Sequence, residues 1–253
     1  MEIIAIINQK GGVGKTTTAV NLSAFLGNKG KKVLLVDFDP QGHAGEHLAC
    51  RNNSTDILDA LYGKKNIMDC LVASYNKNIK VLASNVQLGQ FNQLPPSDNQ
   101  FILQKLIATI PPKSFDFVII DCQPSLSLLT LNALTTSTKV LLPVQAEFLA
   151  LDGMIQLIKT LVEVRAKLHP KLHILGILIT MFDGRNKLSM EVQSELKRNF
   201  TNEVFKTVIP RNISLAEAPS FGKSIFEYSN SSTGAKAYMD AGNELLSRLK
   251  SMK

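Results

Sequence analysis

Apolar residues gather in short runs along this chain, and longer stretches with a helical period separate them. The runs are rich in Val, Ile and Leu and alternate little with polar residues, which is typical of strands covered on both faces in a parallel sheet. The expected strands are residues 3–8, 33–37, 80–83, 117–121, 139–144, 173–180 and 204–209. The expected helices are residues 17–29, 100–110, 126–135, 153–168, 189–200 and 234–250. This alternation predicts an α/β fold with a doubly wound, mostly parallel sheet and helices on both faces.

Composition is compatible with one large folded unit. Of the 253 residues, 45% are hydrophobic, which is enough for a sizeable core. No linker divides the chain, so residues 1–253 are expected to form a single domain, with residues 63–99 as its least regular part. The apolar N-terminus lacks a basic segment and a cleavage site, and no apolar run approaches the roughly 20 residues that span a bilayer. We therefore expect a cytoplasmic protein without a stable membrane anchor.

Charge leaves two interpretations open. The net charge is +7, and residues 185–253 carry eleven basic against seven acidic side chains. Such an excess fits an anionic partner such as nucleic acid, and it also fits an ordinary solvated surface.

A glycine-rich segment between the first expected strand and the first expected helix predicts a phosphate-binding loop. The usual pattern is G-x-x-x-x-G-K-[ST]; Gly14, Lys15 and Thr16 supply its end, although Gln9 stands where the first glycine is expected. Glycines let backbone N–H groups point at phosphate oxygens, and the helix that follows offers its positive end to the anion. The expected nucleotide contacts are Lys10, Gly11, Gly12, Val13, Gly14, Lys15, Thr16 and Thr17. Lys15 would reach the β- and γ-phosphates of ATP, and the Thr16 hydroxyl would bind Mg²⁺.

Carboxylates at two strand ends complete the predicted site. Asp37 and Asp39 follow one apolar strand, and Asp121 closes another in the manner of a Walker B strand. Ligands bind at the carboxyl ends of strands in open α/β sheets, where carboxylates can support Mg²⁺ and position an attacking water.

The segment from Lys10 to Thr17 resembles the deviant Walker A motif of the ParA/MinD ATPases, and residues 37–42 resemble the D-x-D-P-Q-G motif of ParA proteins. The resemblance implies that Lys10 reaches the nucleotide held by a partner subunit, so that ATP drives homodimer formation. It also implies that Asp39 orients the hydrolytic water, with Asp37 nearer the metal and Asp121 holding Mg²⁺. Gln123 departs from the family pattern, which has proline there, and this puts the local loop geometry in doubt.

Further blocks resembling ParA/Soj proteins run through residues 143–147, 176–185, 209–212 and 217–220. By this resemblance Thr180, Met181, Pro210, Arg211 and Asn212 lie at the adenine. The resemblance also implies non-specific DNA binding by the dimer and a ParB-type protein that stimulates a slow ATPase, with the protein on the nucleoid when ATP-bound. Arg185 matches a family arginine implicated in DNA contact, whereas Ser214 stands where some relatives carry another. Candidates by charge and position alone are Lys187, Lys197, Arg198, Lys206, Lys223, Lys236, Arg248 and Lys250.

Two other classes remain as alternatives. A MinD-like membrane-surface ATPase needs a basic amphipathic C-terminal helix, but the apolar positions of residues 234–250 would serve equally well to pack on the sheet. An ATPase that handles metal clusters needs paired cysteines, and Cys50, Cys70 and Cys122 share no suitable spacing.

Overall fold

A computed structural model describes residues 1–50, 57–95, 99–147 and 150–252. Its centre is an eight-stranded sheet in the order β3-β4-β2-β5-β1-β6-β7-β8. All neighbouring pairs are parallel except β3 and β4, which are antiparallel. The strands are β1 (Glu2–Ile6), β2 (Val33–Phe38), β3 (Leu71–Ala73), β4 (Ile79–Leu82), β5 (Phe117–Cys122), β6 (Lys139–Gln145), β7 (His173–Phe182) and β8 (Val204–Pro210).

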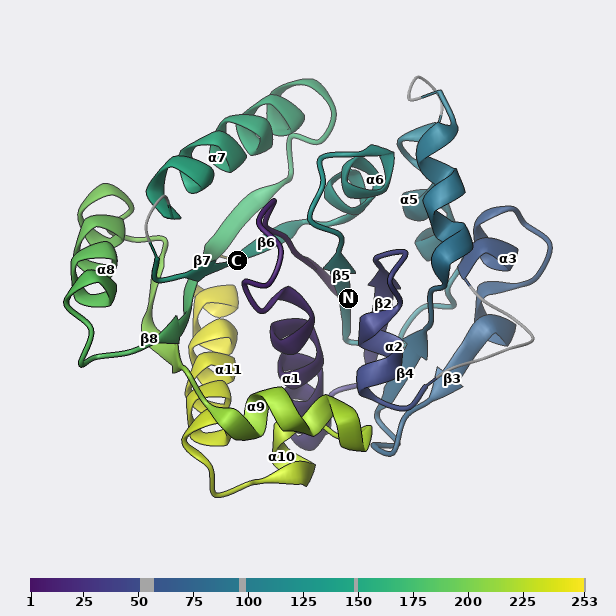
Figure 1. The fold of residues 1–253 in the computed structure, drawn as a ribbon. Helices are drawn as coiled ribbons and strands as arrows, with labels where there is room; N and C mark the ends of the chain where they lie inside the picture. Colours follow the sequence, from purple (N-terminus) through teal and green to yellow (C-terminus); the bar gives the residue numbers. More distant parts are fainter. Residues whose placement is uncertain (51–56, 96–98, 148–149, 253) are drawn as a thin grey trace.

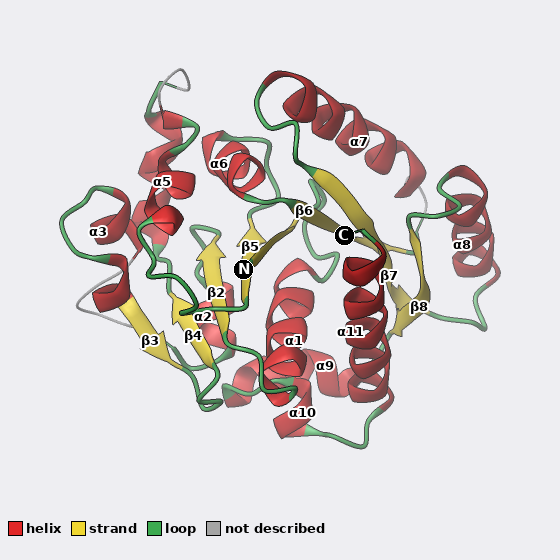
Figure 2. Ribbon diagram, turned by 180° about the vertical axis from the view of Figure 1, so that it is seen from behind, coloured by secondary structure: helices red, strands yellow, loops and turns green. Residues whose placement is uncertain are grey.

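Helices cover both faces of this sheet, as Figures 1 and 2 show. The α-helices are α1 (Lys15–Asn28), α2 (His43–His47), α3 (Ile57–Leu61), α5 (Ile102–Ala108), α6 (Leu128–Thr136), α7 (Ala150–Lys167), α8 (Lys187–Asn199), α9 (Ile213–Glu217), α10 (Ile225–Tyr228) and α11 (Thr233–Ser251). Short 3-10 helices are η1 (Ile67–Cys70), η2 (Val86–Gln93) and η3 (Ala218–Phe221).

The sheet separates two hydrophobic cores because successive strand residues point to opposite faces. Ile4 and Ile6 of β1 pack with α1 and α11 in one core, whereas Ala5 and Ile7 belong to the other, which α5, α6 and α7 cover. The contact between α1 and α11 is close: a Cβ on Gly242 would lie 2.3 Å from the Phe25 ring, so only glycine fits there. This packing holds α1, and thus the loop that precedes it, firmly against the sheet.

The doubly wound α/β fold expected from the sequence is confirmed, and each expected strand and helix occurs within a few residues of its predicted bounds. Residues 63–99 are more regular than expected. They hold η1, η2 and the antiparallel hairpin of β3 and β4 at one sheet edge. The sequence shows no β3 because Leu71, Val72 and Ala73 form too short a run to carry a period.

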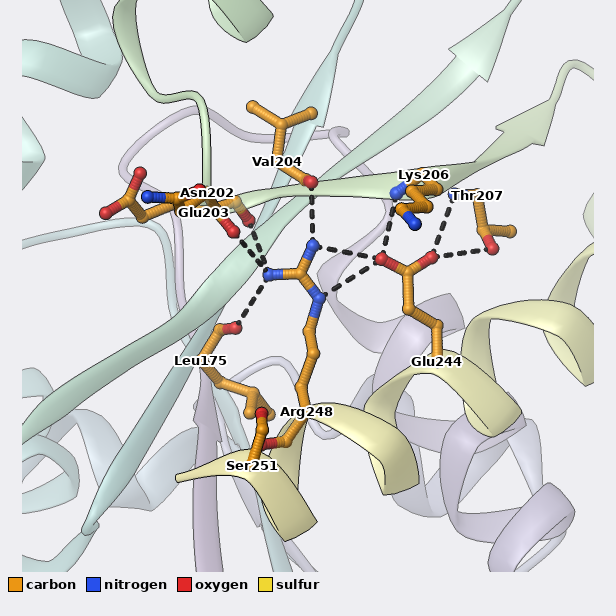
Figure 3. Close-up of polar contacts among 9 residues, drawn as sticks. All are labelled: Leu175, Asn202, Glu203, Val204, Lys206, Thr207, Glu244, Arg248 and Ser251. Carbon is orange, nitrogen blue, oxygen red and sulfur yellow. Dashed lines mark hydrogen bonds and ion pairs between the residues drawn. The ribbon is translucent and has the colours of Figure 1, made fainter. Parts of the chain in front are cut away.

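At the opposite edge of the sheet, two side chains of α11, Glu244 and Arg248, bind backbone groups of β8 (Figure 3). Glu244 accepts hydrogen bonds from the backbone N–H groups of Lys206 at 2.8 Å and Thr207 at 2.9 Å, and pairs with Arg248 at 2.9 Å. The Arg248 guanidinium lies 4.3 Å from the centre of the Phe205 ring. It also donates to the backbone carbonyls of Leu175, Asn202, Glu203 and Val204. Arg248 therefore holds α11 against β7 and β8. Its charge made it a candidate for DNA contact, but its guanidinium is bound within the protein.

Candidate functional site: a phosphate loop, paired carboxylates and a base pocket

The phosphate loop lies between the end of β1 and the start of α1. Gly12 and Gly14 have φ angles of 74° and 84°, a left-handed conformation that glycine adopts at little cost. The Val13 side chain is buried, and its carbonyl accepts a hydrogen bond of 2.9 Å from the Thr180 hydroxyl on β7. Among the residues that the structure describes, no side chain caps the N-terminus of α1, and the N–H groups there can bind an anion.

Lys15 and Thr16 begin α1 and point toward different partners. The Lys15 ammonium donates a hydrogen bond of 2.9 Å to the Lys10 carbonyl, and burial lowers its pKa. The Thr16 hydroxyl donates to Asp121 Oδ2 at 2.7 Å. A lysine that can bind phosphate oxygens, followed by a threonine whose hydroxyl can bind Mg²⁺, is the pair that phosphate loops use for a nucleoside triphosphate.

The sheet places two carboxylates side by side, because Asp37 of β2 and Asp121 of β5 are directly opposite in the parallel register. Both are fully buried. Burial raises the pKa of Asp37 to about 7, against the opposing effect of hydrogen bonds from the Gly45 and Asp39 N–H groups. Burial, and then the nearby charge of Asp37, raise the pKa of Asp121 well above its usual value. Two buried carboxylates in contact favour a cation between or beside them.

Asp121 offers a free ligand atom to such a cation. Its Oδ2 accepts from Thr16, whereas Oδ1 is buried and has no hydrogen-bond partner among the described residues. Within the described part of the chain, no three His, Cys, Asp or Glu side chains form a metal-binding group. Few protein ligands, with water and phosphate oxygens completing the shell, are what Mg²⁺ typically uses. The residues present therefore fit Mg²⁺ bound together with a nucleotide.

Asp39 lies beside these carboxylates and is only half-buried. Its Oδ1 accepts a hydrogen bond of 2.9 Å from the Gln41 N–H, which orients the carboxylate at the end of β2. The loop after β5 is braced in another way, since the amide of Gln123 donates to the Ser127 hydroxyl ahead of α6.

A cavity of about 270 Å³ opens next to Gly14 and Thr17. It is lined by residues from β7, β8, α9, α11 and the turn between β8 and α9. The lining includes all five positions expected at the adenine, so we call this cavity the base pocket: Thr180, Met181, Pro210, Arg211 and Asn212. The Asn212 side chain caps α9 by accepting from the Leu215 N–H at 3.0 Å and donates to Thr233 at 3.0 Å. Asn212 thus shapes the pocket wall, while its amide group is already hydrogen-bonded within the protein.

Comparison with known proteins decides the family. An AAA-domain family model matches residues 1–174. The sporulation initiation inhibitor Soj of Bacillus subtilis is 44% identical over 96% of this chain and 98% of its own length. The chromosome-partitioning ATPase Soj of Thermus thermophilus is 45% identical over 97% of this chain and 96% of its own length. The chain belongs to the ParA/Soj family of partitioning ATPases.

A solved structure supports the fold of this ParA/Soj chain. Cobyrinic acid a,c-diamide synthase from Mycobacterium smegmatis, crystallised with ADP and magnesium, superposes with a TM-score of 0.85 at 32% identity. The match covers 100% of this chain and 97% of that one.

Five of the nine basic residues considered for DNA contact fall in two places; the ParA/Soj resemblance suggested one of the five, Arg185, and charge and position suggested the other four. Arg185, Lys187, Lys197 and Arg198 lie on α8 and the loop before it, whereas Lys223 lies between η3 and α10. These two segments are well separated in Figures 1 and 2. All five side chains are exposed. One subunit therefore groups four of the five candidates and leaves Lys223 apart.

Sequence reasoning missed two residues that shape the ParA/Soj phosphate loop. The Asn8 amide donates to the Pro143 carbonyl at 2.7 Å, and its oxygen accepts from the Lys10 N–H at 2.9 Å. Glu147 pairs with the Lys10 ammonium at 3.1 Å. Glu147 stands within a recognised family block, but no local pattern indicates its contact with Lys10, because 137 positions separate the two residues.

Proposed function

We propose that this chain is an ATP-dependent dimerising switch that segregates a chromosome or plasmid. In this proposal the ATP-bound dimer binds DNA without sequence preference, and a ParB-type protein stimulates an otherwise slow hydrolysis. The protein is then cytoplasmic and nucleoid-associated when ATP-bound. The names of two relatives support a role in segregation: one is a chromosome-partitioning ATPase, and the other is a chromosome partitioning protein.

The observation that carries the proposal is the different placement of two lysines in one loop. Lys15 is buried inside the loop, where it can bind the subunit's own nucleotide. The Lys10 side chain is 51% exposed at the start of the loop, and its ammonium binds Glu147. An exposed second lysine is suited to a nucleotide held by another copy of the chain.

Hydrolysis follows from the arrangement of the remaining groups. Asp39 would orient a water for in-line attack on the γ-phosphorus, the bond to the β–γ bridging oxygen would break, and ADP and phosphate would leave. Magnesium, held with Thr16 and Asp121 and with Asp37 nearby, would supply neutralisation of phosphate charge. We expect slow turnover because Asp39 is half-exposed, so the water is poorly held until a partner covers it.

The MinD-like alternative finds no support in the C-terminal helix. The apolar face of α11 is buried against the sheet through Ala237, Tyr238, Ala241, Leu245 and Leu249. Across the described residues, no helix combines the length and apolar character that crossing a membrane requires.

A paired pull-down tests the proposal. The protein is sedimented with DNA and, separately, with anionic liposomes, each with and without ATP and Mg²⁺. We expect retention on DNA only with ATP, and loss of retention in Lys15→Ala because that variant lacks the ammonium that binds the phosphates. Retention on liposomes alone would support the MinD-like class, and normal ATP affinity of Lys15→Ala would overturn the phosphate-loop assignment.

A further inference from the structure

The residue Lys10 is held at three points within its own subunit. Its N–H donates to Asn8 Oδ1 at 2.9 Å, and its carbonyl accepts from the Lys15 ammonium at 2.9 Å. Its own ammonium binds Glu147 Oε2 at 3.1 Å. Only the third contact fixes the end of the side chain, so Glu147 determines where the Lys10 charge lies.

Glu147 is itself oriented by neighbours. It follows β6, and its Oε1 accepts a hydrogen bond from the Gln145 side chain. The same oxygen lies 3.9 Å from the Arg211 guanidinium, at the wall of the base pocket. The carboxylate therefore sits between the phosphate loop and the base pocket, with one oxygen turned to Lys10.

We propose that Glu147 is a positioning residue that retains the Lys10 ammonium within its own subunit and so sets the threshold for dimer formation. The inference rests on the proposed function, in which Lys10 reaches a nucleotide held by a second copy. In this inference the Lys10 ammonium moves away from the Glu147 Oε2 that it binds at 3.1 Å in order to reach a phosphate of that nucleotide. Formation of the dimer thus requires two Lys10–Glu147 pairs to open.

Nucleotide binding does not have to disturb the backbone contacts of Lys10, because the Lys15 ammonium has three N–H donors and can bind phosphate while it still donates to the Lys10 carbonyl. Neither backbone contact holds the end of the Lys10 side chain. The pair with Glu147 is the contact that keeps the ammonium in place. Because the Lys10 and Glu147 side chains are 51% and 45% exposed, this pair is weak enough to open readily.

The size of the effect follows from that exposure. An exposed ion pair shifts an equilibrium by roughly 1.4- to 5-fold, and the dimer would open two of them. Removing the carboxylate should therefore tighten the dimer by about two- to thirtyfold. The gain should shrink as salt screens the pair.

The test compares Glu147→Gln with Glu163→Gln, which removes the same charge from an exposed pair with Lys167 on α7. Dimer dissociation constants are measured by analytical ultracentrifugation with Mg²⁺ and a non-hydrolysable ATP analogue, at low and high salt. We expect a tighter dimer for Glu147→Gln at low salt, convergence with wild type at high salt, and wild-type behaviour for Glu163→Gln. Glu147→Asp keeps the charge on a shorter side chain and should fall between Glu147→Gln and wild type.

Several results would overturn the inference. An unchanged or weaker dimer in Glu147→Gln, or an equal change in Glu163→Gln, would remove Glu147 from this role. The affinity of Glu147→Gln for nucleotide is also measured at protein concentrations too low for dimers. A gain in nucleotide affinity of the monomer as large as the gain in dimer affinity would assign the effect to Arg211 and the base pocket. Failure of wild type and all variants to dimerise would instead contradict the proposed function itself.

Discussion

Some residues of the site can be predicted from their neighbours in the sequence, and others cannot. The spacing of Gly14, Lys15 and Thr16 is read directly from the sequence, because neighbouring residues in one loop act on one ligand. Asp121 is predicted by the apolar strand before it. Asn8 and Glu147 act through contacts to other strands, and a pairing between strand ends depends on sheet order, which local patterns do not contain.

Arg185 allows a residue-scale test of DNA binding. Its side chain is 92% exposed and is held by Asp183 at 3.1 Å, so replacing it should leave the nucleotide site intact. For Arg185→Ala we expect weaker DNA retention and a slope of log affinity against log salt that is smaller by about one. Filter binding with ATP across a salt series measures this. Lys77→Ala, at an exposed lysine of the β3–β4 hairpin, is the charge-matched control, and an unchanged slope in Arg185→Ala would remove Arg185 from the interface.

At the scale of elements, α11 was expected from its apolar periodicity, and its packing face was predictable. The attachment of α11 to β8 could not be predicted from the sequence. The carbonyls that Arg248 binds belong to β7, to β8 and to the loop before β8, and their approach to α11 is set by tertiary packing alone. The short α9 and α10 also lack a periodic signal, since each spans less than two turns.

Replacing Arg248 should loosen α11 from the sheet edge. The side chain is 18% exposed, and its loss removes a donor from several carbonyls and the ion-pair partner of Glu244. Arg248→Ala should lower the free energy of unfolding by about 2–3 kcal/mol, and the melting temperature by roughly 4–12 °C. Lys250→Ala, at an exposed position of α11, should change little. Equal melting temperatures of Arg248→Ala and wild type in thermal denaturation would contradict the anchoring role.

The ion pair between Glu244 and Arg248 also predicts that the stability of the protein depends on pH. Burial alone would raise the pKa of Glu244, but hydrogen bonds from Thr207, Lys206 and Arg248 outweigh it and hold the pKa below its usual value. A depressed pKa in the folded state means that this stabilisation is present above the pKa of an unfolded glutamate and is lost as pH falls through the folded value. Urea unfolding between pH 3 and 6 should therefore show a smaller acid-induced loss in Glu244→Gln than in wild type. Parallel curves for the two proteins would exclude Glu244 as a source of acid sensitivity.

For the whole molecule, the alternation of strands and helices predicts the fold class but not the strand order. β1 lies between β5 and β6, although these strands follow it by more than a hundred residues. This central place puts the phosphate loop beside Asp121 on one neighbour and beside Glu147 just after the other. The sheet thus places the buried Lys15 near the carboxylates that we propose bind the metal, while Lys10 is exposed at the start of the loop. This arrangement suits the proposed nucleotide-dependent dimer.

Sedimentation equilibrium of the Asp39→Ala variant tests this account most directly, because removal of the residue that we propose orients the water should block turnover and preserve the ATP-bound state. With saturating ATP and Mg²⁺ we predict a particle of twice 27.8 kDa, and with ADP a single chain. Lys10→Ala added to Asp39→Ala should abolish the doubling while ATP still binds. A mass of 27.8 kDa for Asp39→Ala under saturating ATP and Mg²⁺ would contradict the account.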